Sequence, residues 1–573
     1  MKTKKLLAMG LTAIMLVCSA AGCGNSETKG ASQTAAPVNS TEKGSDAAAS
    51  TAAESAGTPG DADTSGTGDT SGTDNANGSD GTTGSTAPAD GSAAYNVDWE
   101  DTAEINVVLI APGAVPPGLQ EVEDAINEIT EDEIDTHVNL EMLEMGNYIQ
   151  QLSLKLSSSE QVDLVMSFPG GSVTFNAMQT QGQLMDITQL LADYGQPVLD
   201  TVGQYIKATT INGKIYGVPV FRNYSTSVYA VLRTDVLEDL GLVEQAQNMK
   251  CLKDLEVILE AVKTSEKWGY LAGLSPAAGN GTIAFNGGAI IGIDSAQHLL
   301  FDTLGASDLI MVDPTGQDTT VKLTPATPEY KELYEYVHEW YEKGYVYKDS
   351  ATATDTGIDL VKADKGLGML MNGELGMEAT TSMMCQMPMT CVPLVTLPIS
   401  TGTCTGFTWA VPNSAKYPEA AVTFLSMMYT SPEINDLLAW GVEGRDYVIK
   451  DGFAQYPDGV TDAPYHSADY ITGNQFIVTP WVGQSADIRE QSMKVLTDAP
   501  ISAYLGFTCN TDSISNELSA VNNVVAEYAA QINSGVAEPG VLDDYLKKLE
   551  SSGVQKVVDE YQNQLDAWLE QNK

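Results

Sequence analysis

The sequence has few residues of the kinds that bind transition metals. Among 573 residues there are 7 cysteines and 4 histidines, and the histidines stand far apart: His137, His298, His338 and His466. Beyond residue 23 the cysteines show none of the paired spacings of a zinc site: Cys251, Cys385, Cys391, Cys404 and Cys509. We therefore expect no bound metal and no other cofactor. One disulfide among Cys385, Cys391 and Cys404 is compatible with an oxidising compartment, and buried free thiols are the alternative interpretation.

Basic residues are also scarce, since 29 Lys and Arg stand against 76 Asp and Glu, which gives a formal net charge of −47. Nucleic-acid recognition needs a basic footprint, so this composition argues against it, and it equally disfavours docking of the folded part on anionic lipid head groups. Nucleotide-binding loops are missing too, because Gly287-Gly288 and Gly366-Leu367-Gly368 have neither the G-x-G-x-x-G nor the P-loop spacing. No serine nucleophile elbow occurs, and we expect no enzymatic activity.

An apolar run at the N-terminus extends from Leu6 to Ala21 and follows three lysines among the first five residues. The run is too short for a comfortable transmembrane span, and residues 1–22 are predicted to be a secretory signal peptide. The small residues before Cys23 resemble a bacterial lipoprotein signal, although Ala20 stands where such signals carry leucine. The resemblance implies a diacylglyceryl group and palmitate-type acyl chains on Cys23, which would hold the lipoprotein to the extracytoplasmic face of the cell membrane. The alternative is an ordinary signal peptide that is cleaved elsewhere.

Residues 23–94 are rich in Ser, Thr, Gly, Ala and Asp and have almost no large apolar side chains. Such a segment cannot bury enough surface to offset its ordering entropy, so we predict a disordered tether. As a flexible coil of about 70 residues it would reach roughly 45 Å. Acidic fragments between Asp61 and Gly81 lack the ligand spacing of a calcium loop, which favours a solvated spacer.

The rest of the chain alternates between predicted strands and helices. Its length of about 475 residues exceeds what one hydrophobic core usually serves, so two lobes are expected. Strands are predicted near 104–111, 138–142 and 162–166, with amphipathic helices at 119–129 and 148–156 between them. This alternation predicts βαβ units and an α/β fold of mainly parallel sheets flanked by helices.

Helical periodicity returns in the second half. Helices are predicted at 329–344, after a Thr-Pro start, and at 418–429. Two more end the chain, with apolar stripes from Leu518 to Ile532 and from Val554 to Trp568. These stripes are most simply interpreted as core contacts.

Four stretches share their order and spacing with a known family. They are NYIQQLSLKLSSSEQVDLVMS (147–167), INGKIYGVP (211–219) with VYAVLRTDVLEDLG (228–241), GFTWAVPNSAKYPEAAVTFLSMMYTSPEINDLLAWGVEGRDY (406–447), and GNQFIVTPWVGQ (473–484) with LGFTCNTDSISNELSAVNNVVAEY (505–528). In this order they resemble an extracellular solute-binding protein of an ABC importer, family 1, of the lipoprotein subgroup associated with oligosaccharide uptake.

The resemblance implies a two-lobed, periplasmic-binding-protein-like fold with inter-lobe hinge crossings, in which ligand lies in the cleft and the lobes close by hinge bending. Lobe 1 would take 101–220 plus 406–438, and lobe 2 would take 221–405 plus 439–573. The crossings would lie near 218–229, 405–412 and 440–447. The resemblance also implies the membrane subunits of an ABC permease as partners, and we expect a monomer.

A neutral sugar has apolar ring faces and a fringe of hydroxyl groups, so its site needs flat aromatics beside Asp, Asn, Arg or Glu side chains. Residues of both kinds lie near the expected strand ends and crossings. The candidate ligand-binding residues are Tyr148, Phe168, Arg222, Asn223, Tyr224, Trp409, Trp440, Glu443, Arg445, Asn474, Gln475 and Trp481.

Several candidates have an equally simple structural interpretation. Trp409 lies in an apolar strand and is compatible with a core position. Glu443 and Arg445 are compatible with a turn ion pair that fixes the hinge without contacting ligand. Tyr224 and Trp481 lie in polar, Gly- and Pro-containing surroundings, which favours a place in the cleft.

Together these features favour a lipid-anchored, non-enzymatic receptor that captures an oligosaccharide and delivers it to a permease. A receptor for a peptide or another polar solute is the first alternative. The second is a secreted glycoside hydrolase, which needs two carboxylates about 5 to 10 Å apart across a cleft. Acidic residues are abundant, but no strand-end arrangement singles out such a pair.

Overall fold

The structure is a computed structural model that describes residues 99–158, 160–275, 285–306 and 309–572. The predicted signal peptide (1–22), Cys23 and the tether (23–94) lie outside the described residues. Within the described part, no helix is both long and apolar enough to span a bilayer.

The first sheet has five strands in the order β2-β1-β3-β16-β6. Strand β1 (Ala103–Ala111) carries the apolar run INVVLI and is buried along most of its length, as the sequence predicts. It pairs in parallel with β2 (Thr136–Glu144) and β3 (Leu164–Met166). Strand β16 (Thr408–Ala410) lies antiparallel between β3 and β6 (Val218–Pro219). The sheet thus begins as the predicted βαβ arrangement, and its fourth strand, β16, is the one that runs in the opposite direction to the others.

The second sheet has four strands in the order β15-β7-β14-β8. All seven residues of its central strand β7 (Ser227–Arg233) are buried. Strands β14 (Gly366–Gly373) and β15 (Met389–Thr396) are antiparallel to β7, and β8 (Ala272–Leu274) is parallel to β14. This sheet is therefore mixed rather than mainly parallel. The reason is topological, because β7 enters from the first sheet and β15 leads back toward it, so the two strands run in opposite directions.

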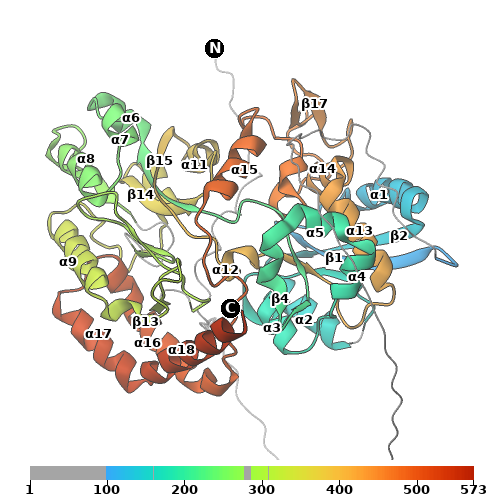
Figure 1. The fold of residues 1–573 in the computed structure, drawn as a ribbon. Coiled ribbons are helices and arrows are strands. Elements are labelled where there is room, and N and C mark those ends of the chain that lie inside the picture. The colour runs from blue at the N-terminus through green and yellow to red at the C-terminus, as the bar shows by residue number, and fades with distance from the viewer. Residues whose placement is uncertain (1–98, 159, 276–284, 307–308, 573) are drawn as a thin grey trace, which may run out of the picture. The chain divides into compact units, whose positions relative to one another are not determined.

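Helices surround both sheets (Figure 1). Those before β7 or between β16 and residue 440 are α1 (Leu119–Ile134), α2 (Tyr148–Ser158), α3 (Phe175–Thr180), α4 (Thr188–Tyr194), α5 (Gln196–Val202), α13 (Pro418–Thr430) and α14 (Pro432–Trp440). The others are α6 (Thr234–Asp239), α7 (Val243–Gln247), α8 (Leu252–Thr264), α9 (Pro328–Glu342), α10 (Gly357–Lys362), α11 (Met377–Cys385), α12 (Thr401–Cys404), α15 (Ile488–Asp498), α16 (Ser515–Asn533), α17 (Gly540–Ser551) and α18 (Val554–Gln571). The chain thus ends in three helices that pack on one another, where the sequence predicted two.

Short elements complete the described chain. The strands are β4 (Thr210–Ile211), β5 (Lys214–Ile215), β9 (Phe285–Asn286), β10 (Ala289–Ile290), β11 (Leu299–Leu300), β12 (Ile310–Met311), β13 (Lys322–Leu323), β17 (Val448–Lys450) and β18 (Phe453–Gln455). The 3-10 turns are η1 (Gly171–Val173), η2 (Gly203–Thr209), η3 (Thr324–Ala326), η4 (Asp469–Ile471), η5 (Gln475–Ile477) and η6 (Asp512–Ile514).

Helix α9 shows how closely the sequence specifies one element. The Thr327 hydroxyl accepts a hydrogen bond from the backbone N–H of Tyr330 at 3.3 Å, and Pro328 occupies the first helical position. One stripe of the helix is buried in the core beneath the second sheet: Tyr330, Leu333, Tyr334, Val337 and Trp340. This is the predicted apolar stripe, and its packing accounts for the helix.

Each sheet has its own hydrophobic core. The first core extends past the expected lobe boundaries, since it includes Tyr224 and Cys404 and later Tyr465, Ile471 and Leu496. The five cysteines beyond residue 23 are all free thiols.

The chain passes between the two sheets three times. The first passage joins β6 to β7 and the second joins β15 to β16, close to the expected positions. The third does not lie at 440–447 as expected. It lies near residue 501, where the backbone N–H of Ile399 donates to Pro500 O and that of Ser502 donates to Ile399 O, both at 2.8 Å.

Residues 440–447 form a turn beside the first core: Val442 packs on that core, whereas Trp440 and Tyr447 belong to a small separate cluster. The buried Asp446 carboxylate accepts from the backbone N–H of Val442 at 2.8 Å and from that of Tyr465 at 3.2 Å. Tyr465 itself donates its hydroxyl to Leu438 O at 2.8 Å. The Asp446 carboxylate therefore joins the Gly-x-Glu-Gly turn to Tyr465, a distant partner that local sequence patterns do not reveal.

Candidate functional site

Aromatic rings gather at the carboxyl end of β3. Tyr148 opens α2 and donates its hydroxyl to Met166 O at 2.5 Å, which fixes the ring beneath the strand end. Phe168 follows β3, and its ring centroid lies 5.9 Å from that of Tyr148 and 6.4 Å from that of Phe407. Phe407 in turn lies 6.0 Å from Tyr470. The predicted residues Tyr148 and Phe168 thus belong to a continuous row of rings.

An ion pair stands beside this row, at the first passage between the sheets. Arg222 Nη1 lies 3.3 Å from Glu374 Oε1, and the two side chains are 14% and 30% exposed, so each is mostly buried but keeps some contact with solvent. The guanidinium carbon of Arg222 lies 5.7 Å above the Phe407 ring, a cation–π geometry. A charged group is therefore held against an aromatic face.

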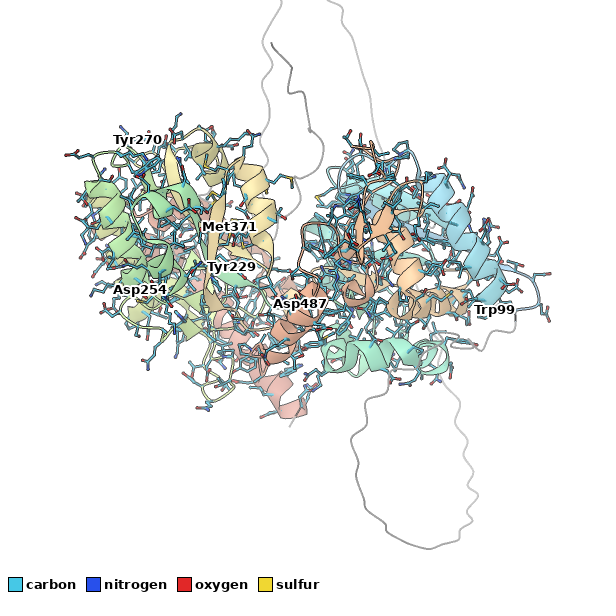
Figure 2. All side chains as sticks on the ribbon, turned by 90° about the horizontal axis from the view of Figure 1, so that it is seen from above. Trp99, Tyr229, Asp254, Tyr270, Met371 and Asp487 are labelled. Atoms are coloured by element: carbon cyan, nitrogen blue, oxygen red, sulfur yellow. The ribbon has the colours of Figure 1, made fainter. Side chains whose placement is uncertain are left out.

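Glu374 follows β14 directly, and its carboxyl group has a perturbed acidity. Burial raises the pKa of Glu374, the Arg222 guanidinium opposes that shift, and the Asp469 carboxylate adds to it. Tyr229 and Met371, which are paired neighbours on β7 and β14, belong to the same sheet (Figure 2). Burial also raises the pKa of Tyr229 to about 12, with Glu374 contributing. Tyr229 is therefore a neutral hydrogen-bonding group near this carboxylate.

Three further polar residues extend the site, from η4, η5 and the start of α15. Asp469 lies 2.7 Å from Arg489 Nη2 and accepts a hydrogen bond from Gln475 Nε2 at 3.3 Å. We call the whole set the Arg222 cluster: Phe168, Arg222, Glu374, Phe407, Asp469, Tyr470, Gln475 and Arg489. Flat rings beside fixed carboxylates, an amide and guanidinium groups can stack on a sugar ring and bond its hydroxyls.

A second group of rings, the aromatic box, consists of Trp440, Tyr456, His466 and Trp481. Trp440 and Trp481 lie 4.9 Å apart by ring centroids, and His466 lies 4.6 Å from Trp481. Burial lowers the pKa of His466 to about 4, so the imidazole is neutral at physiological pH. Trp440 donates its indole N–H to Thr479 O at 2.9 Å. The predicted residues Trp440 and Trp481 therefore lie together, in a box of rings.

Four other predicted residues are buried among structural contacts. Trp409 is fully buried and donates its indole N–H to Thr472 O at 2.9 Å. Tyr224 is 1% exposed, with its ring 4.9 Å from that of Tyr205. Asn223 accepts from the backbone N–H of Ser225 at 3.0 Å, and Asn474 donates to Tyr429 O at 3.0 Å. Trp409 thus has the core position that its apolar strand allows, whereas Tyr224, expected in the cleft, is buried in the first core.

Glu443 and Arg445 do not pair with each other in the described structure. Arg445 Nη2 lies 2.5 Å from Asp446 Oδ2, and its Nη1 lies 3.3 Å from Glu121 Oε2 on α1. Glu443 is exposed. Arg445 therefore joins the turn to the start of α1. The interpretation of Glu443 and Arg445 as an ion pair was wrong.

Sequence reasoning missed five members of the Arg222 cluster: Glu374, Phe407, Asp469, Tyr470 and Arg489. Glu374 carried a usable signal, because it is a polar residue immediately after a buried strand. The others lie in turns and at a helix start whose long-range partners have no local signature.

Comparison with known proteins defines the class. The family model described as bacterial extracellular solute-binding protein matches residues 124–444, which is more than half of the chain. The chain belongs to this family. A domain of unknown function, DUF3502, matches residues 503–570, which we call the C-terminal domain and which contains α16, α17 and α18.

Particular relatives narrow the comparison. A carbohydrate ABC transporter substrate-binding protein of Streptococcus pneumoniae serotype 4 is 27% identical over 483 residues, 80% of this chain and 90% of the relative. The solved N-glycan transport solute binding protein NgtS of Streptococcus pneumoniae is 25% identical with a TM-score of 0.70, covering 82% of this chain and 100% of that one. The alginate-binding protein AlgQ2, 16% identical over 83% of this chain and 99% of its own with a TM-score of 0.51, shares the fold. The predicted two-lobed α/β fold of a solute-binding protein is thereby confirmed.

Proposed function

We propose that this chain is the lipid-anchored receptor of an ABC importer, and that it captures an oligosaccharide in an inter-lobe cleft by hinge closure and delivers it to the permease. The observation that carries this proposal is the Arg222 cluster, in which aromatic faces adjoin fixed carboxylate and guanidinium groups at a passage between the sheets. The relatives support it, because NgtS is also solved in complex with Man1GlcNAc and with Man5GlcNAc. The receptor holds its ligand unchanged and performs no catalysis.

The ligand class is tested by calorimetry and thermal unfolding of the full-length chain with high-mannose oligosaccharides, other oligosaccharides and peptides. A ligand at 100 times its Kd stabilises the folded state by about 2.7 kcal/mol, so the cognate class raises the unfolding temperature clearly. We expect oligosaccharides to do this. Stabilisation by peptides alone contradicts the proposal. Cleavage of the sugar also contradicts the proposal, because a receptor leaves its ligand unchanged. If cleavage occurs, Glu374 and Asp469 are the first carboxylates to test, since they interact electrostatically.

The anchor is tested on Cys23. In cells labelled with radioactive palmitate, Cys23→Ser should lose the label and move from the membrane to the medium, because the acyl chains supply the attachment. Cys18→Ser, inside the apolar run, is the matched control and should keep both label and membrane association. Unchanged labelling of the Cys23→Ser protein would place the acyl group on another residue, and absence of label from the unsubstituted protein would show that the signal peptide is an ordinary one.

A further inference from the structure

A second cavity lies apart from the Arg222 cluster and the aromatic box, and the C-terminal domain forms much of its wall. Its volume is about 460 Å³, within the range of small-molecule sites. Residues of α3, α12 and the segment 504–512 line it, and none of them belongs to the two groups described above. We call it the C-terminal cavity.

The cavity wall has an acidic and hydroxyl-rich character. Asp302 and Asp512 line it, and the described wall contains no Lys, Arg or His. An anionic ligand would find no cationic partner in the described wall, which disfavours phosphates and carboxylates. The remaining polar wall consists of hydroxyl and amide side chains: Thr174, Asn176, Thr180, Gln181, Thr401, Thr508, Asn510 and Thr511.

Two buried polar atoms of the wall have no hydrogen-bond partner among the described residues. They are Asn176 Oδ1 on α3 and Thr508 Oγ1 in the C-terminal domain. Buried polar groups are nearly always satisfied, so both atoms point to a missing partner. The amide oxygen accepts a hydrogen bond, whereas the hydroxyl can donate or accept, and a ligand hydroxyl suits either atom.

The rest of the wall is held in place by its own bonds. Asp302 Oδ2 accepts from the Ser502 hydroxyl at 2.5 Å, and Oδ1 accepts from the backbone N–H of Leu304 at 2.8 Å. Thr401 Oγ1 accepts from the backbone N–H of Gly506 at 2.8 Å. Because both oxygens of Asp302 are already engaged, the cavity holds no free carboxylate pair for an organic cation. Because these hydrogen bonds already fix the wall, a ligand can bind in the cavity without a large entropic cost of ordering it.

Three buried aromatic side chains complete the wall, namely Tyr504, Phe507 and Tyr561. These rings close the cavity from behind, and its accessible wall is the hydroxyl and amide fringe, which can bond the hydroxyl groups of a sugar unit. We propose that the C-terminal cavity binds one small, uncharged, polyhydroxylated molecule of the size of a single sugar unit, at a site separate from the Arg222 cluster.

The test uses the full-length chain and ligand-observed saturation-transfer NMR with glucose, mannose, galactose and N-acetylglucosamine, and with putrescine and inorganic phosphate for comparison. At least one monosaccharide should bind. Thr508→Val keeps the side-chain shape but removes the hydroxyl, and Asn176→Leu removes the amide oxygen; each should weaken binding about fivefold or more. Thr264→Val, on the exposed face of α8, is the matched control and should leave it unchanged.

Two variants distinguish the C-terminal cavity from the Arg222 cluster by their effects on monosaccharide and oligosaccharide binding. Arg222→Ala should weaken oligosaccharide binding and leave monosaccharide binding intact, whereas Thr508→Val should do the reverse. If the Asn176→Leu protein fails to fold, the isosteric Thr508→Val decides alone. Absence of monosaccharide binding, unchanged binding in the Thr508→Val protein, binding of putrescine or phosphate alone, or loss in the Arg222→Ala protein would each overturn the proposal. If the unsubstituted protein binds a monosaccharide but no oligosaccharide, the proposed function is contradicted and the proposal for the C-terminal cavity is not.

Discussion

Asp163→Asn is expected to lower the free energy of unfolding by about 3 to 5 kcal/mol, because it removes a buried carboxylate that organises three segments. Asp163 is fully buried at the start of β3. Its Oδ1 accepts from the backbone N–H of Lys416 at 2.6 Å and from that of Tyr417 at 3.0 Å. Its Oδ2 accepts from the backbone N–H of Asn106 at 2.9 Å and from Gln161 Nε2 at 2.8 Å. Asparagine would place an N–H₂ donor against some of these donors.

The measurement is urea unfolding followed by circular dichroism. Asp294→Asn is the matched control, since Asp294 is 70% exposed in its pair with Lys253 and exposed pairs contribute about 0 to 1 kcal/mol. Equal shifts of the urea midpoint in the two variants would show that the Asp163 hydrogen bonds add no net stability.

The parts of the fold that follow from periodicity were predictable. The strand expected at 104–111 is β1 (Ala103–Ala111), and the helix expected at 329–344 is α9 (Pro328–Glu342). In both, an unbroken apolar run or a regular stripe requires burial on one side, so local sequence determines the element. Strand direction in the second sheet was not predictable in this way, because it depends on the passages to and from the first sheet.

Long-range polar contacts explain why the site was only partly predictable. Arg222 was a candidate, but its partner Glu374 lies 152 positions away, and no spacing rule connects them. Arg445 had an acidic neighbour two positions before it, yet it pairs with Asp446 and Glu121. Trp409 and Tyr224 are chemically suited to a sugar site, but burial places them in the first core. Residue type alone does not separate these roles, because aromatic side chains serve both.

Arg222→Ala is expected to weaken oligosaccharide binding about 10- to 100-fold, because hydrogen bonds to a charged group contribute about 1.5 to 3 kcal/mol. The Arg222 side chain is 14% exposed, and Glu374 and the Phe407 ring hold its guanidinium, so the group is already oriented for a ligand. Calorimetry gives the affinity. Lys253→Ala is the matched control, because it removes a cation from an exposed ion pair away from the cluster. Equal affinity of the two variants would remove Arg222 from the site.

The same substitution should change the pH dependence of binding. Burial raises the pKa of Glu374, and Arg222 opposes the rise, so loss of the guanidinium raises that pKa further. A protonated carboxyl accepts fewer hydrogen bonds, so affinity falls as the pH drops through the Glu374 pKa. The acid limb of the affinity profile should therefore move to higher pH in the Arg222→Ala protein and vanish in the Glu374→Gln protein. An acid limb that persists in the Glu374→Gln protein would assign the titration to another group, and the Glu374 carboxylate would then not be the ligand's hydrogen-bond acceptor.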